Sequence, residues 1–163
     1  MLYLLDANML ISAQELHYPL GRIPQFWAWL LSIAEAGTSK LPVEIFNEIA
    51  ISKGDLKDWL ASPDHARGLK LSGQVDGTIL QNFINQGYAL DLTDSELEQV
   101  GQDPFLVAYA IPYGADVTVV TREVSSPNKQ RQNRKVPDVC KHFGVRCITD
   151  FQLFQELDFR IMS

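Results

Sequence analysis

The chain opens with Met1-Leu2-Tyr3-Leu4-Leu5-Asp6-Ala7-Asn8, five apolar or aromatic residues followed by an acid and, two positions later, an amide. A short apolar run of this kind predicts a buried strand, residues 1–5, that places a carboxylate at its C-terminal end. In open α/β sheets, ligands gather outside the carboxyl ends of the strands, where loops converge over the sheet. Asp6 is therefore the first candidate active-site residue. Asp is also a preferred N-cap, and capping the next helix would by itself account for Asp6.

The length and composition are typical of one globular domain. The 163 residues are 46% hydrophobic and 21% charged, which suits a single core that buries roughly two-thirds of the unfolded surface. We therefore expect one domain over residues 1–163. No apolar run is long enough to span a membrane, and Met1 leads into the first strand without a basic leader, which predicts a cytoplasmic protein. Cys140 and Cys147 form no Cys-x-x-Cys pair and are expected to be reduced core residues.

Strand and helix signals alternate along the chain. The predicted strands after the first are residues 39–43, 68–71, 117–121 and 145–148, and the predicted helices are residues 23–36, 44–51, 55–60, 75–85, 105–111 and 136–143. Capping-box patterns at Thr93 and Thr149 begin two further helices. Asp103 is the expected N-cap of the helix that follows Pro104. Such alternation with short connections predicts an α/β fold of three layers, a mainly parallel sheet with helices on both faces.

Four acids fall at strand ends or helix starts. Asp6 ends the first strand, and Glu48 lies on the helix after the second. Asp103 opens the helix before strand 117–121, and Glu123 follows that strand. At the edge of a parallel sheet these side chains are expected to converge, and clustered carboxylates are costly because some must stay protonated. Divalent cations remove that cost, and paired Mg²⁺ or Mn²⁺ ions roughly 4 Å apart suit in-line displacement at phosphorus.

At these positions the chain resembles the PIN-domain nucleases, specifically a little-characterised bacterial and archaeal PIN-like family with an N-terminal Leu-Leu-Asp-Ala-Asn motif. The resemblance covers nearly the whole chain. It rests on Leu5-Asp6-Ala7-Asn8, Glu48-Ile49, Asp103 with the later Ala108-Tyr109-Ala110, and Val120-Thr121-Arg122-Glu123.

The resemblance implies a Rossmann-like PIN domain with metal-dependent ribonuclease activity, in which such acids hold Mg²⁺ or Mn²⁺ and activate a water. Asp6, Glu48 and Asp103 then take the three most regular metal positions, with Asn8 and Thr121 as polar supports. Many relatives of this type are VapC-like toxins of toxin–antitoxin pairs. An RNA substrate, an antitoxin partner and a homodimer are therefore expected from the resemblance alone.

The chain departs from the family pattern in two places. The fourth acidic position is usually Asp and here is Glu123, which is longer. The connection after it is extended over residues 124–135, so Asp138 beyond this segment is an alternative fourth acid, ranked below Glu123. Glu44, one helical turn before Glu48, is the rival for the second position. A first-turn Glu is, however, sufficiently explained by the helix dipole.

A net charge of −6 at first argues against a nucleic-acid ligand. The charges are unevenly distributed, since residues 122–135 hold five of the 14 bases and one of the 20 acids. This basic loop is expected to follow an RNA backbone near the metals, through Arg122, Lys129, Arg131, Arg134 and Lys135. The alternative interpretation is a solvated charged loop.

Two other classes of function can be compared with the sequence. Haloacid-dehalogenase phosphatases need a second Asp two residues after the first, and this position is Asn8. A catalytically inactive PIN-like module that binds RNA or a protein partner ranks below the nuclease because all four acids are retained. The preference for RNA over DNA rests on the resemblance only.

Overall fold

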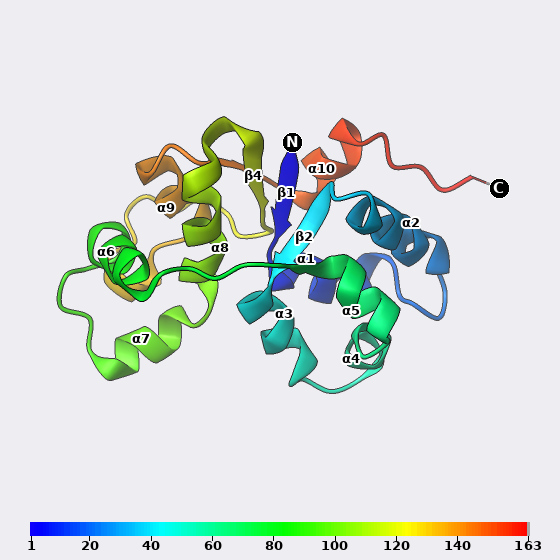
Figure 1. The fold of residues 1–163 in the computed structure, drawn as a ribbon, viewed down its shortest axis with the longest axis horizontal. Coiled ribbons are helices and arrows are strands. Elements are labelled where there is room, and N and C mark those ends of the chain that lie inside the picture. The colour runs from blue at the N-terminus through cyan, green and yellow to red at the C-terminus, as the bar shows by residue number, and fades with distance from the viewer. Residues whose placement is uncertain (163) are drawn as a thin grey trace.

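The computed structural model describes residues 1–162 and contains one five-stranded sheet, in which all neighbouring strands are parallel (Figure 1). Its strands are β1 (Leu2–Leu5), β2 (Ser39–Pro42), β3 (Lys70–Leu71), β4 (Val117–Val120) and β5 (Arg146–Ile148). They lie in the order β3-β2-β1-β4-β5. The predicted α/β fold with a parallel sheet is thus confirmed.

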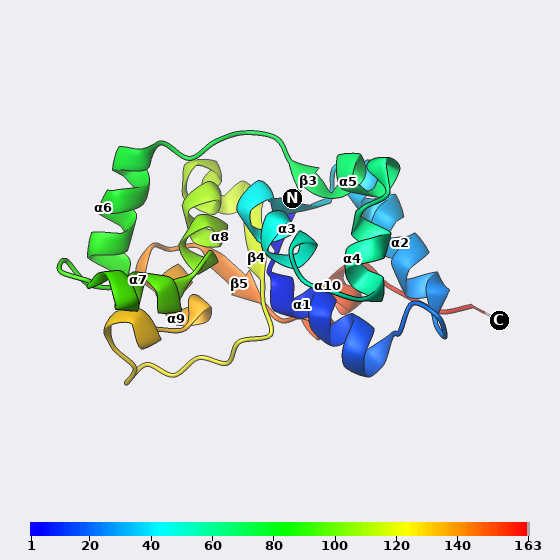
Figure 2. The same ribbon diagram turned by 90° about the horizontal axis from the view of Figure 1, so that it is seen from below.

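Helices cover both faces of the sheet. Along the chain they are α1 (Ala7–Ser12), the π-helix η1 (Ala13–His17), α2 (Pro24–Glu35), α3 (Val43–Ala50), α4 (Asp55–Leu60), α5 (Pro63–Leu69), α6 (Gly77–Gly87), α7 (Asp94–Val100), α8 (Asp103–Ala110), the 3₁₀ turns η2 (Ile111–Asp116) and η3 (Arg131–Asn133), α9 (Val136–His142) and α10 (Asp150–Glu156). Helices α2, α4, α5 and α10 lie on one side of the sheet and α6, α8 and α9 on the other (Figures 1 and 2). These are the three layers expected from the sequence.

β1 is the central strand and the point at which the strand order reverses. From β1 the chain adds β2 and β3 on one side, then crosses to add β4 and β5 on the other. Leu4 and Leu5 are fully buried, and Leu5 pairs with Val120. The next residues along the two strands are Asp6 and Thr121, so both stand at the switch point where open α/β sheets bind ligands.

The structure differs from the sequence prediction at the end of α5 and at the start of α8. The sequence predicts a strand over residues 68–71, whereas α5 extends to Leu69 and the strand keeps two residues. Asp103 is the first helical residue of α8, and the N-cap is Gln102, which makes no side-chain capping bond. The capping boxes at Thr93 and Thr149 are confirmed, each with both reciprocal hydrogen bonds.

Two further predictions concern membrane spans and cysteines. Among residues 1–162 no helix combines the length and the apolar character needed to cross a bilayer. Both cysteines are free thiols; Cys140 is buried, and Cys147 is half-buried on β5.

The packing of α6 on α9 gives a test of the fold. A Cβ added at Gly87, the last residue of α6, would lie 2.9 Å from the Phe143 ring and 3.2 Å from a Val139 methyl group. We expect Gly87→Ala to lower the free energy of unfolding by about 1–3 kcal/mol through overpacking, as measured by urea denaturation. Gly77→Ala, at the other end of α6 with no atom within 4 Å of the added Cβ, is the matched control. An equal effect of both substitutions would contradict this packing.

Candidate functional site

The hydroxyl of Thr121 joins the ends of β1 and β4. It donates a hydrogen bond to Asp6 Oδ2 at 2.8 Å and accepts one from Asn8 Nδ2 at 3.2 Å. The Glu123 amide also donates to it at 3.1 Å. Asn8 Oδ1 in turn accepts from the Arg122 amide at 3.1 Å. Asn8 and Thr121 therefore form a polar support that fixes one Asp6 oxygen and the start of the segment carrying Glu123.

Asp6 stands at the N-cap position of α1, yet its carboxylate makes no capping hydrogen bond. Helix capping therefore does not account for this acid. The side chain is buried, with 4% of the residue's surface exposed. Burial raises the pKa of Asp6 to about 6; the charges of Glu123 and Glu48 act in the same direction, and the Thr121 hydrogen bond opposes them.

Asp103 is the second strongly perturbed acid. Burial raises its pKa to about 8, and the negative charges of Asp6, Glu123 and Glu48 add to the rise, while Lys135 opposes it. No side-chain hydrogen bond reaches its carboxylate from residues 1–162. The charges of Glu48 and Glu123 therefore act on both Asp6 and Asp103, and the charge of Asp6 also acts on Asp103.

The two glutamates of α3 have different surroundings. Glu48 is exposed on the helix, and partial burial of its carboxylate raises its pKa. Its charge acts on both Asp6 and Asp103. Glu44 instead accepts a hydrogen bond from the Tyr109 hydroxyl at 3.1 Å. The other Glu44 oxygen, Oε2, is buried and has no hydrogen-bond partner within residues 1–162. The action of the Glu48 charge on Asp6 and Asp103 is what favours Glu48 as the second member of the cluster.

The two alternative fourth acids are also separated by their contacts. Glu123 Oε2 accepts a hydrogen bond from the Val136 amide at 2.7 Å, at the start of α9. Asp138 accepts from the Ser125 hydroxyl with one oxygen and from the Ser126 amide, at 2.8 Å, with the other. Both Asp138 oxygens therefore hold the loop, whereas Glu123 keeps one oxygen without a hydrogen bond from residues 1–162. This favours Glu123.

The bases of the loop fall into two groups. The arginines make internal contacts: Arg122 pairs with the buried Asp150 at 2.9 Å and contacts His17 Nε2 at 2.8 Å. Arg131 binds acids near α7, and Arg134 donates to backbone carbonyls. Lys129 and Lys135 line a polar pocket of about 320 Å³ together with Asp103 and Glu123.

Tyr88 is a residue near the site that the sequence did not indicate. Its hydroxyl is buried and has no hydrogen-bond partner within residues 1–162. Burial raises its pKa, and the charges of Asp103 and Glu123 raise it further. A buried hydroxyl without a partner beside two carboxylates is a group that a bound water or a hydrated ion would satisfy. The only sequence signal was its position directly after the glycine that ends α6.

The four acids are the type of ligand that a hard divalent cation prefers, but their arrangement is not that of a complete metal site. All donors are oxygens. Burial raises the pKa values of Asp6 and Asp103, repulsion from neighbouring acids raises them further, and a bound cation would reverse the rise. Within residues 1–162, however, no group of three or more His, Cys, Asp or Glu side chains is arranged so that it could hold a metal ion as it stands.

Comparison with protein families identifies a matching family. The model of a family described as a domain of unknown function, DUF4411, matches residues 3–161. No curated protein matches the chain.

The raised pKa of Asp103 predicts how stability depends on pH. The unfolded chain loses this proton near the ordinary Asp pKa of about 4, whereas the folded protein keeps it up to about pH 8. Stability contributed by this group therefore falls as the pH rises between these values. We therefore compare the unfolding free energy of Asp103→Asn with that of wild type at each pH. The variant's value relative to wild type is expected to rise by on the order of 2–4 kcal/mol from pH 5 to pH 8.

Urea denaturation in EDTA at both pH values measures this difference. The exposed Asp58 of α4 provides a matched control, Asp58→Asn, which lies outside the cluster and is expected to differ from wild type by the same amount at both pH values. If Asp103→Asn also differed from wild type by the same amount at both pH values, the raised pKa of Asp103 would be contradicted.

Proposed function

We propose that this chain, which belongs to the DUF4411 family, is a Mg²⁺- or Mn²⁺-dependent endoribonuclease that hydrolyses RNA phosphodiester bonds. The observation that carries the proposal is the group of four acids around the switch point, where Asp6 and Asp103 have raised pKa values. A cation is the ligand that relieves this repulsion. The choice of RNA, and a role as the toxin of a cytoplasmic toxin–antitoxin pair with an antitoxin partner and a homodimeric state, come from the resemblance to PIN-domain nucleases.

Each acid has a distinct part in the proposed site. When bound, the metal ions would neutralise the acids and the charge that develops on the reacting phosphate. Asp6 is the rigid member, because the Thr121 hydroxyl orients one of its oxygens. Asp103 is held at the first residue of α8, and Glu48 is the accessible member on α3. Glu123 is tethered at Oε2 by the Val136 amide.

The hydrogen bond from the Val136 amide to Glu123 also favours an alternative function. In this alternative the chain is a PIN-like module that binds RNA or a protein partner without cleaving it. Glu123 Oε2 already receives a short hydrogen bond from the backbone. A fourth acid that is committed to the loop would leave three acids for the metal. The two functions differ in whether bound RNA is cut when metal is supplied.

A cleavage assay separates the two functions. Wild-type protein with Mn²⁺ is expected to cut single-stranded RNA, and Asp6→Asn is expected to reduce the rate by at least about 100-fold, since removing a metal ligand removes several kcal/mol of charge stabilisation. Asp58→Asn, outside the cluster, is expected to retain wild-type activity. Mn²⁺ is also expected to raise the melting temperature of wild type more than that of Asp6→Asn. RNA binding without cleavage in either metal would favour the module and overturn the nuclease.

The two glutamates of α3 provide a second test. Glu48→Gln is expected to lower the Mn²⁺-dependent cleavage rate by about 100-fold or more, because the substitution removes one carboxylate of the proposed metal site. Glu44→Gln keeps the length of the side chain that binds Tyr109 and is expected to stay within about threefold of wild type. The reverse order of effects would assign the second metal position to Glu44.

A further inference from the structure

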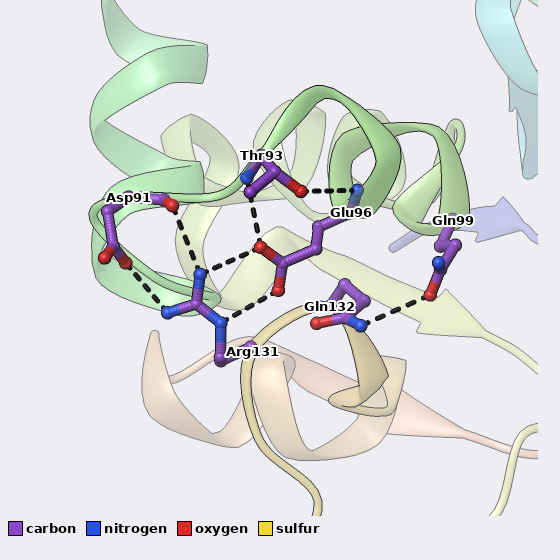
Figure 3. Close-up of polar contacts among 6 residues, drawn as sticks. All are labelled: Asp91, Thr93, Glu96, Gln99, Arg131 and Gln132. Carbon is purple, nitrogen blue, oxygen red and sulfur yellow. Dashed lines mark hydrogen bonds and ion pairs between the residues drawn. The ribbon is translucent and has the colours of Figure 1, made fainter.

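The distal part of the basic loop is fastened to α7 by one arginine (Figure 3). Arg131 Nε and Nη2 donate to the two oxygens of Glu96 at 2.8 and 2.9 Å. Its Nη1 reaches Asp91 Oδ1 at 2.8 Å, and Nη2 also reaches the Asp91 carbonyl at 3.1 Å. Glu96 is itself fixed by the capping box with Thr93. Four of the five guanidinium N–H donors are thus used within the protein.

The backbone at this point is held in an unfavourable conformation. Arg131 has a φ of 56°, the left-handed region that side chains other than glycine rarely adopt. Such residues persist only where surrounding contacts over-determine them. Here the contacts are the Arg131 fork and the Gln132 amide, which donates to Gln99 of α7 at 3.2 Å (Figure 3). The loop is therefore docked in one defined position.

A second arginine fastens the same segment to α6. Arg134 donates from Nη1 to the carbonyl of Gly87, the last residue of α6, and from Nη2 to the Asp138 carbonyl at 3.3 Å. Arg131 and Arg134 thus attach both ends of a short stretch to the helices around Asp103. The lysines that flank this stretch, Lys129 and Lys135, form no ion pair within residues 1–162.

The docked loop closes a pocket beside the acids. The pocket holds about 320 Å³ and is lined by polar and charged side chains. Its lining includes two acids, Asp103 and Glu123, and two lysines of the loop, Lys129 and Lys135. Lys135 is near enough to Asp103 to lower its pKa. A pocket lined by both carboxylates and lysines without ion pairs offers contacts to a cation and to an anion.

We propose that Lys129 and Lys135 of this pocket bind the backbone phosphate that flanks the cleaved one, with Arg131 as a positioning residue that keeps the loop in place. The location of the cleaved phosphate rests on the proposed function, whereas binding at the lysines needs neither metal nor cleavage. Lysine suits a phosphate as a mobile point charge, and the arginine forks are already used within the protein.

Binding is measured by fluorescence anisotropy with a labelled single-stranded RNA of about 12 nucleotides, in EDTA, over a series of NaCl concentrations. The variant Lys129→Gln/Lys135→Gln is expected to bind about tenfold more weakly than wild type. The slope of log K against log[NaCl] is expected to fall by roughly 1.4, because each lysine that no longer neutralises a phosphate of a single strand lowers it by about 0.7. The matched control is Lys53→Gln/Lys57→Gln, a pair on and beside α4.

These outcomes are distinguishable from failure of the proposed nuclease. Lysine-dependent binding without cleavage in Mn²⁺ would support the phosphate site and contradict the proposed nuclease activity. Cleavage with unchanged affinity and salt slope in the lysine variant would keep the enzyme and overturn the phosphate site. A wild-type protein that does not bind the RNA in EDTA would also overturn it.

The role of Arg131 is tested by the same titration. Arg131→Lys keeps the charge but loses the paired hydrogen bonds to Glu96. If Arg131 is a positioning residue, this variant is expected to bind RNA severalfold more weakly with an unchanged salt slope. Glu96→Gln is expected to have a similar effect, and the double variant is expected to be no weaker than either single variant, since both break one interaction. Arg67→Lys, at an exposed ion pair on α5, is the control.

A direct phosphate contact predicts a different pattern. Arg131→Gln would then lower the slope by about 0.7, and Glu96→Gln would strengthen binding by freeing the guanidinium. Either result would overturn the positioning role. Urea denaturation of each variant checks that the fold is retained.

Discussion

The hydrogen bond from the Thr121 hydroxyl to Asp6 joins the two strands on which the rest of the site depends. β1 and β4 are neighbours in the sheet, but their crossover connections run in opposite directions, so loops from both halves of the chain meet above this pair. The Asp6 amide also donates to the Val120 carbonyl at 2.9 Å. A carboxylate, a hydroxyl and the segment that carries Glu123 are thereby fixed to the most buried part of the sheet.

The clustering of buried acids at this edge of the sheet lowers the stability of the protein. Burial removes hydration from the carboxylates of Asp6 and Asp103 and raises both pKa values, and the charges of Glu123 and Glu48 raise both further. The surrounding packing keeps these two acids from turning out to water. α8 is buried over most of its length, from Pro104 to Ala110 apart from Phe105, so the helix that begins at Asp103 cannot rotate without exposing its core face. Rigid apolar elements thus hold Asp6 and Asp103 in place despite the cost of burying them.

The sequence predicted the features that depend on local chemistry. Apolar periodicity and caps located most strands and helices, because those signals lie within a few residues of the element. The start of α8 was placed one residue late, since Asp and Pro are favoured at neighbouring positions of the first turn. Helix α5 was missed because the short strand signal at residues 68–71 overlaps its last turn. The position of Tyr88 beside the acids depends on tertiary packing alone, and no local pattern indicates it.

The basic loop shows why charge counts along a sequence mislead. Arg131 pairs with Glu96 and Arg122 with Asp150, both far away in the chain, so two of the five basic charges are paired with acids on folding. The remaining lysines matter more than their number suggests. At physiological ionic strength, charges farther apart than about 8–10 Å are largely screened, so the acids elsewhere on the body hardly affect an anion in the pocket. The position of the two lysines, which the docked loop fixes, then decides whether this acidic protein attracts a phosphate.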